Sequence, residues 1–190
     1  MERLALMAEN FNETNLFAEC KNGSREAFES LYNRHQRRVF SVALNFFGGD
    51  IDKASDITQQ VFLKFFTGNS DFRGESEFTT WLYRVTVNAC IDEQRKNRRF
   101  FGLEDFFGLE DKKMKQEDRL QQKQISDEVQ KIVATLKPKF RLPILLKYVE
   151  GLSYDEIAKV LDCSIGTVSS RLNRGHKMLA RKLEHLKGEV

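Results

Sequence analysis

The chain has almost no residues that sterically interrupt a helix. Only two of its 190 residues are proline, Pro138 and Pro143, so nearly the whole backbone is free to be helical. Hydrophobic residues make up 41% of the sequence, which is enough for packed cores. The length allows one large domain or two small ones, and the expected fold class is all-α.

Residues 12–98 carry repeated helical periodicity and form the first predicted domain. Ser24 is a candidate N-cap for a long amphipathic run, which Gly48 and Gly49 should end. A second helix is expected from about residue 50 and a third from about residue 76 to residue 96. With a short N-terminal helix, these segments predict an all-α bundle.

Residues 99–124 separate this domain from the rest of the chain. They contain a tandem duplication, FFGLED at 100–105 and again at 106–111, followed by charged and glutamine-rich sequence without an apolar stripe. This composition is typical of a linker. The duplication is either a docking motif or the product of replication slippage tolerated in a linker, and we favour the second interpretation.

Residues 125–188 form a second predicted helical domain. Pro138 suits the first turn of a helix, and Ser153 to Glu156 is a capping box that opens a short helix. Asp162 and Cys163 then turn the chain, and Ser164 can cap a long final helix. A short helix, a tight turn and a longer helix form a helix-turn-helix pattern.

The final helix carries a basic face with hydroxyl groups at its start. Arginine offers a bidentate fork to guanine or phosphate, and hydroxyls early in the helix can hold phosphates. An ordinary solvated basic face is the alternative, and the capping box and turn upstream make it the weaker one. The predicted duplex-contacting residues are Thr167, Ser169, Ser170, Arg171, Arg174 and Lys177.

The first domain combines aromatic and basic residues on its third helix and in the loop before it. Single-stranded DNA requires this combination, because unpaired bases stack and phosphates need neutralising. Phe78 and Trp81 lie on the apolar stripe and are expected in the core. Tyr83 lies off the stripe, so we expect it to be the freer aromatic side chain.

Several motifs in series resemble one known family. Residues 31–35 (LYNRH), 56–66 (DITQQVFLKFF) and 72–88 (FRGESEFTTWLYRVTVN) resemble region two of bacterial extracytoplasmic-function (ECF, group four) sigma factors. Residues 148–158 (YVEGLSYDEIA) and 166–172 (GTVSSRL) resemble region four of the same family. The motifs occur in the family's order, with a variable linker between them.

The resemblance implies a transcription initiation factor that binds core RNA polymerase and promoter DNA. The polymerase contact is implied for Asp56, Gln59, Gln60 and Phe62. The minus-ten element is implied to contact Ser70, Asp71, Phe72, Arg73, Gly74, Tyr83, Arg84 and Asn88, to which we add the basic Arg95 of the same helix. The minus-thirty-five element is implied to contact the hydroxyl and arginine side chains of the final helix, and an anti-sigma partner is expected.

The sequence departs from the family pattern at three places. Ser169 stands where many members have arginine or lysine, and Gly175-His176 replaces an Ala-Arg pair. Gly175 costs about 1 kcal/mol of helix propensity relative to alanine. Gln60 occupies a position that is often acidic, so we expect the polymerase contact to be tuned but retained.

Other classes of function have less support. No catalytic triad, paired carboxylates, phosphate loop or metal-ligand spacing stands out, so we expect no enzyme activity, cofactor or metal. A helix-turn-helix regulator without polymerase would leave the first domain unexplained, and a sigma-like adaptor without promoter binding is a third alternative. The sequence shows neither a signal peptide nor an apolar run of membrane-spanning length, so a cytoplasmic location is expected.

The formal net charge of +3 is unevenly distributed. Residues 1–98 carry 13 basic and 14 acidic groups, the linker carries 6 of each, and residues 125–190 carry 12 and 8. The basic excess therefore lies in the helix-turn-helix domain. A chain this close to neutral is expected to bind promoter DNA poorly unless polymerase helps.

Overall fold

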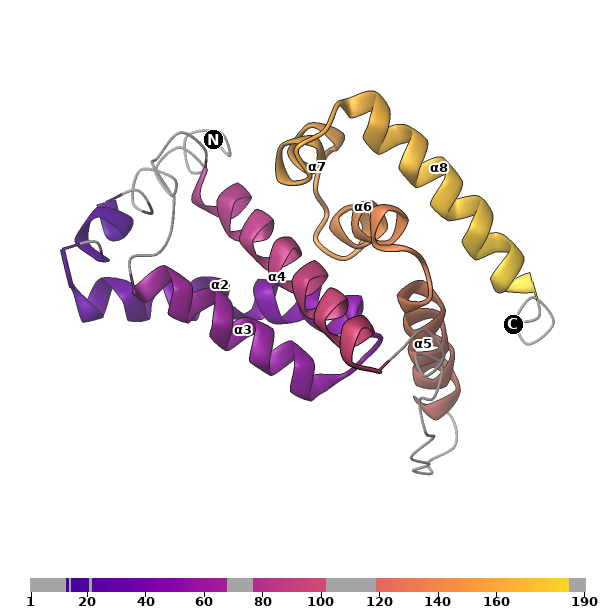
Figure 1. Cartoon of the computed structure of the whole chain (residues 1–190), viewed down its shortest axis with the longest axis horizontal. Helices are drawn as coiled ribbons and strands as arrows, with labels where there is room; N and C mark the ends of the chain where they lie inside the picture. Colours follow the sequence, from indigo (N-terminus) through magenta and orange to yellow (C-terminus); the bar gives the residue numbers. More distant parts are fainter. Residues whose placement is uncertain (1–12, 14, 21, 68–76, 102–118, 185–190) are drawn as a thin grey trace.

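The computed structural model describes residues 13, 15–20, 22–67, 77–101 and 119–184, and in these ranges it contains helices and no strand. Residues 15–20 are helical, and the longer helices follow in chain order (Figure 1): α2 Arg25–Phe46, α3 Ile51–Phe66, α4 Phe78–Phe101, α5 Arg119–Ala134, α6 Pro138–Tyr148, α7 Tyr154–Val160 and α8 Ile165–Lys182. The all-α prediction is confirmed.

The local signals in the first domain act as predicted. Ser24 caps α2 by accepting a hydrogen bond from the Ala27 amide at 3.2 Å, and Asp50 caps α3 from the Lys53 amide at 3.0 Å. Gly48 and Gly49 have φ values of +67° and +94°, a region that favours glycine. They allow the chain to reverse between α2 and α3.

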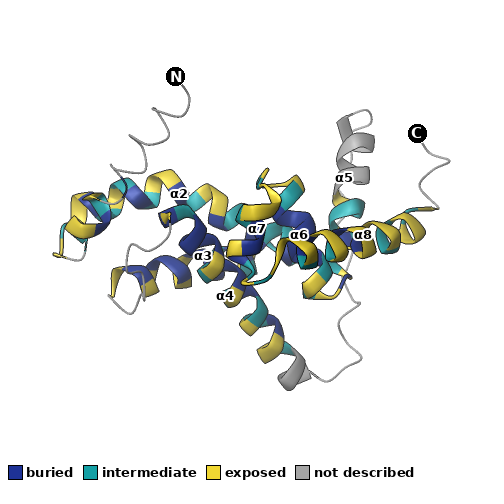
Figure 2. Cartoon of the chain, turned by 90° about the horizontal axis from the view of Figure 1, so that it is seen from above, coloured by how far each residue is buried: buried dark blue, intermediate teal, exposed yellow. Residues whose placement is uncertain are grey.

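The core of the first domain lies between α2, α3 and α4. Buried aromatic rings from all three helices meet there, and Phe65 lies 5.5 Å from Phe78 and 5.8 Å from Trp81 between ring centroids. Phe78 and Trp81 are buried, as the sequence predicts. Figure 2 shows these inner helix faces as buried and the outer faces as exposed.

The helices extend into the predicted linker from both sides. α4 continues to Phe101 and α5 begins at Arg119, so the ends of residues 99–124 are helical. Residues 102–118 lie outside the described part of the chain, and with them most of the FFGLED duplication.

The two domains pack against each other through a buried arginine of α6. The Arg141 guanidinium donates to the carbonyl oxygens of Leu136 and Phe46 and lies 4.3 Å from the centroid of the Phe46 ring. Beside it, the Gln130 side chain donates to Asn45 at 3.0 Å. These contacts join α5 and α6 to the C-terminal end of α2, and α4 packs against α7. Within the described residues, no helix is both long and apolar enough to cross a membrane.

Candidate functional site

The helix-turn-helix unit consists of α7, a turn and α8. Ser153 and Glu156 form the predicted capping box at the start of α7, since the Ser153 amide donates to the Glu156 carboxylate at 2.7 Å and the Glu156 amide donates back to the Ser153 hydroxyl. The hydrogen bond from the Ser153 side chain lowers the pKa of Glu156, although partial burial opposes the effect. Asp162 turns the chain with a φ of +48°, and Ser164 caps α8 through the Thr167 amide.

Gly175 fixes how closely α8 approaches α6. It is buried, and an added Cβ would lie 2.7 Å from Ile144 Cδ1 and 3.4 Å from the Phe140 carbonyl oxygen. The glycine that lowers helix propensity therefore allows close packing of two helices. Leu172 is buried on the same inner side of α8, which leaves the opposite side open to solvent.

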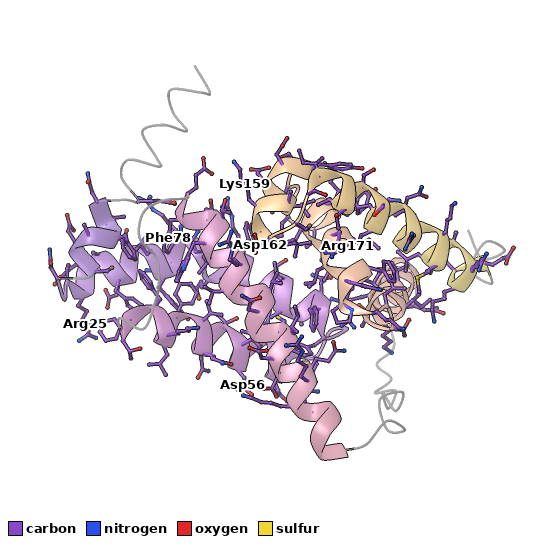
Figure 3. All side chains as sticks on the ribbon, turned by 45° about the horizontal axis from the view of Figure 1, so that its top comes forward. Arg25, Asp56, Phe78, Lys159, Asp162 and Arg171 are labelled. Carbon is purple, nitrogen blue, oxygen red and sulfur yellow. The ribbon has the colours of Figure 1, made fainter. Side chains whose placement is uncertain are left out.

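The outer face of α8 holds most of the predicted duplex-contacting residues. Ser169, Ser170, Arg174 and Lys177 are exposed, and the helix contains no acidic residue between Ile165 and Lys182. Thr167 is half-buried beside the Ser164 hydroxyl at 2.9 Å. Arg171 is also half-buried, with its guanidinium 3.8 Å from the Cys163 sulfur, and it points away from this face towards α4 (Figure 3).

Tyr83 of α4 is not the freer aromatic side chain that the sequence predicts. It is only 6% exposed, and its hydroxyl donates to the Glu150 carboxylate at 2.7 Å. Burial, together with this hydrogen bond, raises the pKa of Tyr83 well above its ordinary value. The prediction was wrong because the partner comes from the other domain, which the helical periodicity of α4 does not reveal.

The other minus-ten residues on α4 lie on one side of the helix. Arg84, Asn88 and Arg95 are exposed and, with Arg171 of α8, line a cleft of about 500 Å³ between the domains. Arg84 donates to the main-chain oxygen of Lys159 at 2.7 Å. The remaining predicted residues, Ser70, Asp71, Phe72, Arg73 and Gly74, lie outside the described part of the chain.

The predicted polymerase-contacting residues on α3 divide into surface and core. Asp56, Gln59 and Gln60 are exposed, whereas Phe62 is only 2% exposed and packs against Tyr32 with ring centroids 4.8 Å apart. Phe62 therefore forms the floor of a groove and offers little surface of its own, which corrects the prediction. The groove, of about 720 Å³, lies between α2 and α3.

Two exposed apolar residues complete this surface, and the sequence reasoning missed both. Leu63 is 63% exposed and Phe66 is 55% exposed, and both line the groove beside the two glutamines. The signal was present, because the periodicity that turns Phe62 and Phe65 inward turns their neighbours Leu63 and Phe66 outward. Exposed large apolar side chains in a groove are typical of a protein-binding surface.

Family models match both domains. Residues 31–100 match Sigma-70 region 2, and residues 126–179 match Sigma-70, region 4.

Curated relatives match nearly the whole chain. The ECF RNA polymerase sigma-E factor of Haemophilus influenzae is 31% identical over 191 residues, covering 95% of this chain and 100% of the relative. The ECF RNA polymerase sigma-E factor of Escherichia coli K12 is 30% identical, with 95% and 98% covered. The ECF RNA polymerase sigma factor SigW of Bacillus subtilis is 29% identical, with 88% and 95% covered.

Solved structures share the fold. The structure of CnrH in complex with the cytosolic domain of CnrY has a TM-score of 0.66 and 23% identity, covering 90% of this chain and 96% of that one. The sigma factor RpoE in complex with the anti-sigma factor NepR from Bartonella quintana has a TM-score of 0.65 and 24% identity, covering 83% and 96%. Both likenesses extend over most of this chain and show that the fold is shared.

Proposed function

Since the chain belongs to the family of ECF RNA polymerase sigma factors, we propose that it uses three separate surfaces for its work. It binds core RNA polymerase and directs promoter-specific transcription initiation. The surfaces are the outer face of α8 for the minus-thirty-five element, α4 with the preceding loop for the minus-ten element, and the groove of α2 and α3 for polymerase.

The assignment of α8 depends on charge and geometry together. Arg174 and Lys177 point outward from a helix without acidic residues, and Ser169 and Ser170 are exposed near its start. A recognition helix inserts its first turns into the major groove, where arginine reads guanine and hydroxyls hold phosphates. The capped start of α8 and the sharp turn before it present these side chains together.

The assignment of α4 depends on its basic face. Arg84, Asn88 and Arg95 lie on one side of the helix, and Tyr83 would stack on an unpaired base only if its buried ring became exposed. Stacking of an unpaired base on an aromatic ring contributes about 1–3 kcal/mol, which would offset part of the cost of separating the strands. Residues 70–74 are the second part of this proposed surface.

The polymerase contact is carried by one observation, the groove beside α3 with its exposed apolar rim. Leu63 and Phe66 supply apolar surface, while Asp56, Gln59 and Gln60 supply polar groups around it. A partner helix fits such a groove with its own apolar face. The two domains, 12–98 and 125–188, would then hold polymerase and promoter while the linker 99–124 spans between them.

A test of this surface compares apolar-to-polar substitutions at two places on the same helix. Leu63→Ser with Phe66→Ser should weaken binding to core polymerase by at least tenfold, since buried apolar anchors contribute more than about 1 kcal/mol each. Ile51→Ser is the matched control, because Ile51 is 64% exposed on α3 but lies outside the groove. If both variants bound polymerase like the unaltered chain, the groove would not be the contact.

The remaining partners and the location of the protein are part of the same proposal. A chain that gives promoter access to polymerase acts where the chromosome and polymerase are, so we place it in the cytoplasm. The similarity to RpoE bound to an anti-sigma factor suggests that a protein inhibitor also binds this chain.

A further inference from the structure

We propose that the cleft between α4 and the C-terminal domain binds a free nucleotide, a nucleoside that carries a di- or triphosphate group. The cleft has a volume of about 500 Å³ and is lined by α4, the start of α6 and the helix-turn-helix unit. Figure 3 shows Asp162 and Arg171 on the side of the C-terminal domain nearest α4. Pockets for small organic ligands measure about 300–1,000 Å³, so the cleft has a suitable size.

The first argument is the positive charge of the lining. It includes one carboxylate, that of Asp162, and four cationic side chains, those of Arg84, Arg95, Lys139 and Arg171. Within the described part of the chain, Arg95 alone of these four has an ion-pair partner, the exposed Asp92 at 3.6 Å. Positive charge that is gathered in a cleft without neutralising carboxylates attracts a multivalent anion.

The second argument is the apolar floor of the same cleft. Six apolar residues, all buried or half-buried, line it: Val87, Ile91, Pro138, Leu142, Val160 and Leu161. Cations alone would suit any polyanion, but an apolar floor favours a ligand that also has a flat, weakly polar part. A nucleobase is such a part, and the side-chain amides of Asn88 and Gln94 offer donors and acceptors for its edge.

The third argument is the length of the cleft. The α4 residues that line it recur at helical spacing from Arg84 to Arg95, which are eleven positions apart. At 1.5 Å per residue this stripe is about 16 Å long. Cations stand at both of its ends, and Lys139 and Arg171 add two more from the C-terminal domain. An elongated ligand with several negative charges fits this distribution better than a single phosphate ion.

The site shares side chains with the proposed minus-ten surface. Arg84, Asn88 and Arg95 belong to both, so this part of the inference rests on the proposed function of α4. A bound nucleotide should therefore compete with single-stranded DNA for them. Lys139 lines the cleft but has no proposed role in promoter binding, so it separates the two functions.

The test is a titration of the isotope-labelled full chain with ATP, without divalent cations, followed by nuclear magnetic resonance of the main-chain amides. We expect saturable shifts at residues 87–91 and 160–162, which line the cleft, and none at residues 56–60 of α3. ATP should bind at least about tenfold more tightly than inorganic tripolyphosphate or adenosine, because each of these lacks one half of the interaction.

The decisive substitution is Lys139→Gln, which removes one cation from the cleft at an exposed position. It should weaken ATP binding about fivefold, as expected for one charge-assisted contact at a partly exposed site. Lys137→Gln is the matched control, since Lys137 is exposed on the other side of Pro138, lies outside the lining and makes no side-chain capping hydrogen bond. Neither substitution should change the affinity for a fluorescent single-stranded DNA 20-mer.

Each other outcome overturns the proposal. An unaltered chain without saturable shifts at about 1 mM ATP has no such site, and this result leaves the proposed minus-ten role of α4 intact. Tripolyphosphate that binds as tightly as ATP would show a simple polyanion surface. Equal effects of Lys139→Gln and Lys137→Gln on ATP binding would exclude the cleft as its location. A Lys139→Gln chain that loses affinity for DNA and ATP alike would make the cleft part of the nucleic-acid surface.

Discussion

Gly175 allows a test of how α8 is positioned. Replacing it by alanine gains about 1 kcal/mol of helix propensity, but the added Cβ would lie 2.7 Å from Ile144 Cδ1. Overpacking a filled core costs about 1–3 kcal/mol. We therefore expect Gly175→Ala to lower the free energy of unfolding by up to about 2 kcal/mol, although alanine is the better helix former.

The steric origin of this loss is tested by removing the atom that the new methyl group meets. Ile144→Val deletes Cδ1 and alone should cost about 0.5–1.5 kcal/mol. In the double variant the methyl group introduced by Gly175→Ala fills the vacated space, so the overpacking disappears while the gain in helix propensity stays. The double variant should be more stable than the sum of the single changes predicts by about 1–3 kcal/mol.

The measurement is urea unfolding of all four proteins followed by helical circular dichroism. Additivity within about 0.5 kcal/mol would refute the reasoning, because it would mean that the new methyl group and the Ile144 side chain do not compete for space. A Gly175→Ala chain that is about 1 kcal/mol more stable than the unaltered one would refute it more directly.

Three further predictions concern the same domain. Leu172→Ala should lower the free energy of unfolding by about 2–5 kcal/mol, because Leu172 is buried between α8 and the domain core. Urea unfolding measures this loss. A loss below about 1 kcal/mol would contradict the burial of Leu172 in a filled core. The pKa of Glu156 is lower in the folded chain than its ordinary value. Its carboxylate therefore stabilises the fold fully at pH values above the unfolded-state pKa of about 4.3. This stabilisation is lost as the pH falls through the lower folded-state pKa. Glu156→Gln should therefore flatten the acid side of the stability curve, and an unchanged curve would argue against the capping box. Arg174→Ala should weaken duplex binding and reduce its salt dependence by about one released counterion. Asn173→Ala, a change at the neighbouring exposed residue, should alter neither the affinity nor the salt dependence. Fluorescence anisotropy at several salt concentrations measures both quantities, and equal effects of the two variants would contradict the role of Arg174.

The signals that could be predicted from the sequence are local ones. Ser24, Ser153 and Ser164 cap helices because their hydroxyls meet amides three residues away, and such spacing is visible in a linear sequence. Phe78 and Trp81 are predictable as core residues for the same reason, since helical periodicity places them on one apolar stripe, and both are buried.

The features that could not be predicted depend on contacts between distant segments. Tyr83 and Glu150 are 67 residues apart, and Arg141 and the Phe46 carbonyl are 95 apart. No periodicity of either helix indicates that the domains would meet at these points. Phe62 differs from these cases, because the family resemblance names it as a polymerase-contacting residue while the packing of α2 against α3 leaves it only 2% exposed.

The central claim is that this chain gives polymerase its choice of promoter. The most direct measurement is transcription in vitro with purified core RNA polymerase, the full chain and a library of random DNA, followed by sequencing of the transcript starts. We expect starts at a restricted set of sites that share two upstream elements. Arg174→Ala should alter the use of the minus-thirty-five element while the starts remain dependent on the chain. Starts that do not differ with and without the chain would contradict it.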